Sequence, residues 1–269
     1  MLLTILFGLI VGFSLGLTGG GGAIFAVPLL VYGLAMAPSE AIGVSLASVG
    51  SLSAIGLLGR WRMGQVELKT GLLFAFAGMA GTPLGSWLAG KLPEQVLLLL
   101  LALLMVIVAT RMWMLATAPE LLQPTGLQDD SGVACRRDAL GGLSLTTRCG
   151  AVLIAVGLAT GILTGLLGIG GGFVIVPALI MFSGMPIHRA VGTSLLVVAI
   201  VSMGGFASHL VLGRTIPIAI TITFVAGGIA GMALGMGLSH RFSGPGLQRT
   251  FAIAIFAVAT FVIGERFFH

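Results

Sequence analysis

The sequence predicts an all-α, polytopic integral membrane protein made of two homologous repeats, each with about four hydrophobic segments. Only 8% of the 269 residues are charged and 57% are hydrophobic, and the mean hydropathy is +1.16. A soluble domain carries about 25% charged residues, so a soluble chain of this size could not cover its surface. The other two observations are a series of long apolar runs and a glycine cluster that occurs once in each half.

The apolar runs have the length of membrane helices, with two exceptions. A helix needs about 20 residues to cross a bilayer, whereas the first and fifth runs would form straight helices of about 50 Å. Both long runs contain a glycine cluster near their middle, so we expect the first segment of each repeat to be broken into two half-helices. The runs cover residues 2–34, 41–59, 70–89, 96–116, 150–183, 190–212, 216–238 and 250–267.

The glycine clusters read "GLTGGGGAIFAVP" at 16–28 and "GLLGIGGGFVIVP" at 165–177. Consecutive glycines favour a helix break, and amides freed in this way are tolerated in a membrane only against protein or a polar cavity. A half-helix that starts at Ala23 or Gly172 would point its N-terminal amides, which attract anions, into that cavity. The predicted anion site therefore contains Gly19, Gly20, Gly21, Gly22, Gly168, Gly170, Gly171 and Gly172.

A single offset of 149 residues relates the two halves. The shift pairs Gly12 with Gly161, Gly22 with Gly171, Pro28 with Pro177, Ser45 with Ser194 and Ser53 with Ser202. We therefore expect an N-terminal membrane repeat (1–116), a polar linker (117–147) and a C-terminal membrane repeat (148–269). Broken helices at matching positions of internal repeats indicate a secondary-transporter site.

The orientation of the repeats depends on how each broken segment lies. Two half-helices that together cross the membrane give parallel repeats, whereas a re-entrant hairpin gives inverted repeats. The half-lengths, about 17 and 12 residues, are short for a full span, which favours the inverted arrangement.

Glycines spaced four apart have a different explanation. Such glycines let membrane helices approach closely, and we expect packing to account for Gly12 and Gly16, for Gly157, Gly161 and Gly165, and for Gly231 and Gly235. The contiguous clusters exceed what packing requires, because one glycine per turn is sufficient.

Several hydroxyl groups follow each break. Those nearest to the turns are Ser45, Thr193 and Ser194, and we predict that they donate to the anion; helix packing is the alternative role. Ser48, Ser51, Ser53 and Ser202 lie farther along. Arg60 and His209 are paired by the 149-residue offset and are candidates for the transport pathway, because ionisable residues within a membrane are usually functional. Their alternative place is the membrane interface.

Other classes of function find no support. We see no catalytic constellation, no metal-ligand cluster, no cofactor motif and no basic stripe typical of nucleic-acid binding. The chain is therefore predicted not to be an enzyme. Cys135 and Cys149 are expected to be free thiols, with a linker disulfide as the alternative in an oxidising compartment.

The net charge of +5 fits a multi-pass protein of the cell (inner) membrane. Membrane proteins concentrate Lys and Arg in their cytoplasmic loops, so the linker is predicted to be cytoplasmic. The apolar N-terminus continues into further apolar sequence, and we interpret it as a retained membrane segment.

Residues 16–46 and 165–195 each combine a glycine cluster, a proline and an "AxGxSL" motif (with Val44 in the first copy where the second has Thr193). This chain resembles the TauE/SafE sulfite-exporter family of membrane permeases over essentially its whole length. The resemblance implies transport of small anions such as sulfite, thiosulfate or organosulfonates. A passive anion channel and a membrane scaffold that transports nothing are the alternatives.

Overall fold

The computed structural model describes residues 1–117, 136–137, 143–144, 147–183 and 185–238, together with positions 253, 256, 258 and 260. Most of the predicted linker and most of the last apolar run, 250–267, lie outside these residues. The described part is helical except for a two-residue antiparallel pair in the linker, β1 (Arg136–Arg137) with β2 (Leu143–Ser144). Five helices of this part are long and apolar enough to cross a membrane.

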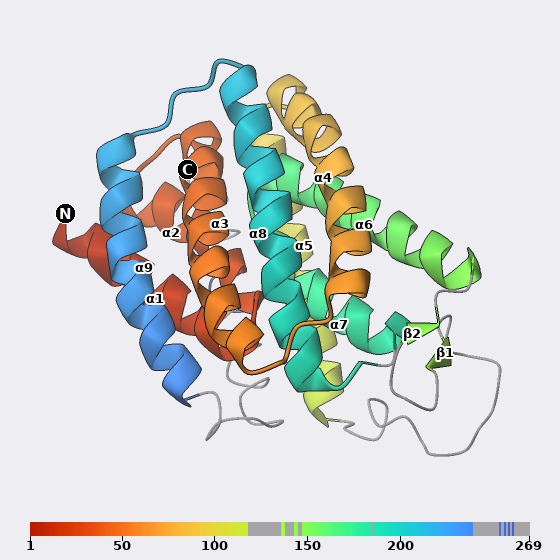
Figure 1. Cartoon of the computed structure of the whole chain (residues 1–269). Helices are drawn as coiled ribbons and strands as arrows, with labels where there is room; N and C mark the ends of the chain where they lie inside the picture. Colours follow the sequence, from red (N-terminus) through yellow and green to blue (C-terminus); the bar gives the residue numbers. More distant parts are fainter. Residues whose placement is uncertain are drawn as a thin grey trace.

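Four upright helices form a row across the molecule (Figure 1). They are α9 (Ile218–Leu238), α3 (Pro38–Arg62), α8 (Ile187–Val211) and α4 (Leu68–Lys91), and each packs against the next in that order. The 149-residue offset exchanges α3 with α8 and, within one residue, α4 with α9. The central pair of the row is therefore made of the two matching helices.

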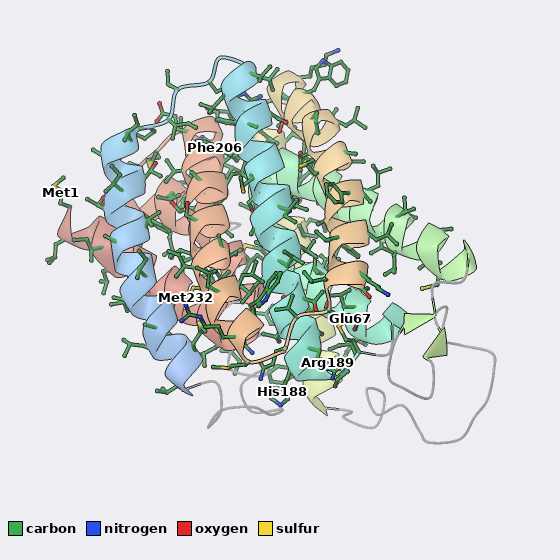
Figure 2. The ribbon with its side chains drawn as sticks, viewed as in Figure 1. Met1, Glu67, His188, Arg189, Phe206 and Met232 are labelled. Carbon is green, nitrogen blue, oxygen red and sulfur yellow. The ribbon has the colours of Figure 1, made fainter. Side chains whose placement is uncertain are left out.

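The two central helices run antiparallel. Gly43, near the start of α3, lies against His209 near the end of α8, while Gly192, near the start of α8, lies against Gln65 just beyond α3. Figure 2 accordingly places Glu67, which follows α3, at the same end of the bundle as His188 and Arg189, which begin α8. This is the arrangement that inverted halves require.

Both long apolar runs are broken, as the sequence predicts. The first consists of α1 (Leu2–Thr18), a short 3-10 helix η1 (Gly21–Phe25) and α2 (Ala26–Gly33). A Cβ on Gly33 would meet the ring of Phe7, so α2 returns alongside α1 and the segment is a re-entrant hairpin. The second run consists of α6 (Thr147–Leu167) and α7 (Gly172–Ser183).

The two halves are interleaved rather than separate. Helix α1 of the first half packs along α9 of the second, and α6 of the second packs along α4 of the first. Glycines make both pairs close: a Cβ on Gly12 would meet the backbone of Gly228, and one on Gly161 would meet the backbone of Gly78. The spaced glycines thus have the packing role predicted for them. Helix α5 (Glu94–Thr117) completes the described helices.

One expectation about the cysteines was wrong. Cys149, at the start of α6, is disulfide-bonded rather than a free thiol. The sequence contains only one other cysteine, Cys135, which lies outside the described residues. The prediction treated each thiol alone, and sequence spacing gives no measure of whether the linker brings two cysteines together.

Candidate functional site

Each break is made of glycines whose backbone conformation other residues rarely adopt. Helix α1 ends at Gly19, which has φ +74° and donates its amide to the Leu15 carbonyl. Helix α6 ends in the same way at Gly168, which has φ +70° and donates its backbone N–H to the Thr164 carbonyl. Gly170 has φ +69°. A side chain in this left-handed region is strained, which explains why glycines occupy these positions.

The two breaks touch each other through backbone atoms. A Cβ added to Gly20 would lie 2.6 Å from the Cα of Gly172, and one added to Gly172 would lie 2.5 Å from the Cα of Gly20. No side chain can separate these two segments without moving one of them. The clusters, 149 residues apart in sequence, therefore meet at one junction.

The site lies at the centre of the α3–α8 pair. A Cβ on Gly170 would lie 2.9 Å from Val49 of α3 and 3.3 Å from Val198 of α8, and these two valines are 149 positions apart. Each lies near the middle of its 25-residue helix. Since α3 and α8 are candidate membrane spans, the breaks meet near half the depth of the bundle.

Two predicted hydroxyls hold the breaks in place. The Oγ of Ser45 on α3 donates to the carbonyl of Gly168 at 2.6 Å, and the Oγ of Ser194 on α8 donates to the carbonyl of Gly19 at 2.6 Å. Each serine thus ties its helix to the break in the opposite half. Thr193 has another partner, because its Oγ1 accepts the backbone N–H of Glu67 at 3.0 Å.

Other buried hydroxyls have no hydrogen-bond partner among the described residues. They belong to Ser14, Ser48, Ser53 and Ser202, all nearly or fully buried. The Oγ of Ser202 lies 3.2 Å from the Cβ position of Gly170, so this hydroxyl borders the second break. Buried polar groups are nearly always paired, and an unpaired donor beside a broken helix is available to a ligand.

Backbone amides add further donors at the second break. The first amides of α7 with a backbone partner are those of Val174 and Ile175, which donate to the Gly171 carbonyl. The amides at the very start of a helix have no intrahelical acceptor. Gly171 and Gly172 therefore present N–H groups and the positive end of the α7 dipole to the junction.

The buried charge in the described part of the chain is basic. Arg60 is 6% exposed and His209 is 1% exposed, and no aspartate or glutamate of that part is comparably buried. Both side chains therefore lie inside the bundle, not at its surface as the interface alternative assumed. An interior with buried basic groups and no buried carboxylate suits an anion better than a cation, because a buried cation without a counter-ion attracts negative charge.

Arg60 and His209 lie near opposite ends of the α3–α8 pair. A guanidinium nitrogen of Arg60 donates to the carbonyl of Gly16, near the end of α1, at 3.4 Å, and another donates to Gln65 at 3.1 Å. Neither ring nitrogen of His209 has a partner among the described residues. Because α3 and α8 are antiparallel, these offset-related residues lie toward opposite ends of the bundle.

Sequence reasoning found the glycines but overlooked two supporting side chains. Gln65 binds Arg60, and Arg214 donates to the Ser86 carbonyl at 3.3 Å, while the Ser86 hydroxyl donates to Gly165 near the end of α6 at 3.4 Å. Gln65 and Arg214 are also 149 positions apart. The offset comparison reached Gly64 and Gly213, and extending it by one residue would have paired Gln65 with Arg214.

Among the residues that the structure describes, no three His, Cys, Asp or Glu side chains lie together as a metal site would require. The donors at the breaks are hydroxyls and amides, which are not the ligand set of a structural metal. The site is suited to holding an anion by hydrogen bonds.

Two broken apolar segments that meet inside a bundle of membrane helices define a polytopic membrane transporter. The family model described as "Sulfite exporter TauE/SafE" matches residues 4–262, and this chain belongs to that family. It is therefore a membrane transporter and not an enzyme.

Relatives with similar names are found in bacteria and archaea. A "Probable membrane transporter protein" of Xylella fastidiosa (strain 9a5c) is 37% identical over 98% of this chain and 95% of its own length. YdhB of Bacillus subtilis, also named a probable membrane transporter protein, is 28% identical over 79% of this chain and 80% of its own. MJ0441 of Methanocaldococcus jannaschii is 27% identical over 77% and 72%. No solved structure matches the chain significantly.

The serine bonds across the halves give the first testable prediction. Ser45→Ala leaves the Gly168 carbonyl buried without its donor, so we expect it to lower the free energy of unfolding by about 1–3 kcal/mol. Ser51→Ala is the matched control, because Ser51 is exposed on the same helix and bonds only within it, to Ala47. Unfolding of the detergent-solubilised protein is the measurement. A Ser45→Ala protein as stable as the control would refute the structural role of this bond.

Proposed function

We propose that this protein is a permease for small anions, with one substrate site at the junction of the two glycine breaks. One observation carries the proposal: Gly20 and Gly172 meet backbone to backbone in a buried region that holds unpaired donors and no buried carboxylate. Glycine lets a ligand approach the amides closely, and amides and hydroxyls at a helix start bind anions.

The site we propose comprises the glycines of both breaks, with the hydroxyls of Ser45, Thr193 and Ser194 as its wall. Ser45 and Ser194 use their protons to hold Gly168 and Gly19 in place. A serine oxygen cannot donate the same proton twice, so in this arrangement the predicted hydroxyls shape the site while the unpaired hydroxyl of Ser202 donates to the anion. Arg60 and His209 border the pathway on its two sides.

The substrates we propose are sulfite, thiosulfate or organosulfonates. The family description names sulfite export, and these ions present several oxygen acceptors to converging N–H and O–H donors.

A permease also needs two access states. The offset-related halves, which we propose are inverted repeats, supply the symmetry by which one half can rock against the other around a fixed site.

Counterflow in proteoliposomes tests this function. We expect saturable uptake of radiolabelled sulfite, with unlabelled sulfite, thiosulfate or sulfoacetate competing better than chloride. Saturable counterflow would also distinguish a permease from an open channel. Absence of uptake with every one of these anions, from folded and inserted protein, would contradict the proposal and favour a scaffold.

A matched pair of variants ties the transport to the breaks. Gly170→Ala and Gly213→Ala impose the same strain, since both glycines have φ +69°, but only the first adds a methyl group in the site: nothing lies within 4 Å of a Cβ on Gly213. We expect counterflow to fall about tenfold or more for Gly170→Ala and to persist for Gly213→Ala. Equal loss in both folded variants would mean that backbone strain, not occupation of the site, explains the effect.

The sidedness of the protein follows from its loop charges. The end of the bundle that includes the α3–α4 connection carries Arg62, Lys69 and Arg189 against Glu67, whereas the other end carries Lys91 and Arg214 against Glu40 and Glu94. The excess of basic residues at the first end favours a cytoplasmic position for it, and the linker begins and ends on that side. The disulfide at Cys149 favours an oxidising compartment instead. We give more weight to the charges, because they come from several separate loops.

Chemical labelling tests this orientation. Arg62 is exposed just before the α3–α4 connection, so a membrane-impermeant maleimide should label Arg62→Cys in inverted vesicles and not in intact cells. The matched control is Glu94→Cys at the opposite end, which should show the reverse pattern. Labelling of Arg62→Cys in intact cells would place the linker outside.

A further inference from the structure

His209 is a buried titratable group that the anion site leaves without a role. Its side chain is 1% exposed, and both ring nitrogens lack a partner among the described residues. Leaving a buried polar atom unpaired costs about 1–3 kcal/mol, and such a group in a native protein requires an explanation. A missing ligand that binds to the imidazole in part of the working cycle is such an explanation.

The imidazole lies close to the wall of the second break. A Cβ on Gly43 would lie 2.7 Å from Nε2 of His209 and 3.1 Å from Ile216 on the connection to α9. The neighbour of Gly43 is Ile42, whose Cα lies 2.8 Å from the Cβ position of Gly168. Two adjacent residues of α3 thus contact His209 on one side and the start of the second break on the other.

In the first half, the residue at the position that matches His209 is Arg60. There Arg60 is permanently charged and is held by the Gly16 carbonyl and by Gln65. His209 replaces that fixed charge with a group that is cationic only when a proton is bound. The two sides of the pathway thus differ in one property: the charge of the basic residue depends on proton binding at His209 and not at Arg60.

The charged groups around His209 are few. Arg214 lies on the connection to α9, and its backbone N–H donates to the carbonyl of His209 at 3.4 Å. Glu40 is half-buried one turn before Gly43 on α3, and Lys91 at the end of α4 places its ammonium over the ring of Trp87. Protonation of His209 therefore puts a second cation near Arg214. An anion that lies between them relieves their repulsion, so the proton and the anion bind more tightly together than apart.

We propose that His209 is a proton-binding site that couples anion movement to a proton, with Arg214 as the second cation of the pair. This inference rests on the proposed anion permease. The proton adds to a free lone pair of the imidazole as the anion arrives, and it leaves from the same nitrogen when the anion departs. No covalent bond to the anion forms or breaks. The acid–base group that a coupled transporter needs is then a histidine on α8, since no carboxylate among the described residues is buried.

Thiosulfate is the probe for this proposal, because its own charge does not change in the range where histidine titrates. Counterflow is measured at equal internal and external pH, in steps from about 5 to about 8. For the wild-type protein we expect uptake to fall as pH rises, by up to about tenfold per unit above the midpoint as the protonated fraction declines. His209→Gln cannot bind the proton, so its uptake should stay near the low level of the wild-type protein at high pH and show no dependence on pH. His188→Gln is the matched control, because His188 is exposed at the other end of α8, and it should keep the wild-type profile.

A second readout follows the proton itself. Net thiosulfate uptake by the wild-type protein should acidify vesicles that contain a pH-sensitive dye, and whatever thiosulfate uptake His209→Gln retains should occur without this signal. His209→Arg is a second variant in case glutamine impairs folding, because it reproduces the arginine of the other half. It should bind thiosulfate with little pH dependence.

The outcomes separate the two proposals. Wild-type uptake with no pH dependence and no proton movement would overturn the role of His209 and leave the permease intact. The same follows if His209→Gln keeps both the pH profile and the proton signal. Absence of any uptake of sulfite or thiosulfate by the wild-type protein would overturn the permease, and the coupling proposal with it.

Discussion

The backbone contact between Gly20 and Gly172 is the constraint on which the rest of the structure depends. Two chain segments can approach this closely only where neither has a Cβ, and both must leave the helical path to do so. The hairpin of α1 and α2, the crossed serine bonds and the interleaving of α1 with α9 and of α6 with α4 all bring the two breaks to this junction. A membrane protein tolerates such irregular backbone only inside protein or beside a polar cavity.

The electrostatics of the interior follow from the same arrangement. Helix starts and hydroxyls lie at the junction, two buried basic side chains lie toward the ends of the α3–α8 pair, and the described residues contribute no buried acid. The site we propose would recognise negative charge mainly through neutral donors, which bind an anion less tightly than several fixed cations would. For a transporter this is useful, because the substrate has to leave as well as bind. The asymmetry between Arg60 and His209 is superimposed on an otherwise symmetrical plan.

Much of this plan could be predicted from sequence. The length of the apolar runs predicts the helices, and the glycine clusters at matching positions predict both breaks, because helix length and glycine conformation are local properties. The partners of Ser45 and Ser194 could not be predicted, since each bond joins residues more than 100 positions apart. For the same reason, sequence reasoning preferred these serines to Ser202 as anion donors. The hydroxyl of Ser202 is the one that lies unpaired beside Gly170. The bridge at Cys149 depends on the path of the linker, which composition does not determine.

The most direct test of this account is an experimental structure of the protein with a saturating concentration of thiosulfate. The account predicts density for one anion between Gly20 and the start of α7, within hydrogen-bonding distance of the Gly171 and Gly172 amides and of the Ser202 hydroxyl. Density for the anion at a place remote from both breaks, or breaks that lie apart with a side chain or lipid between them, would contradict the claim that the two glycine clusters form one site.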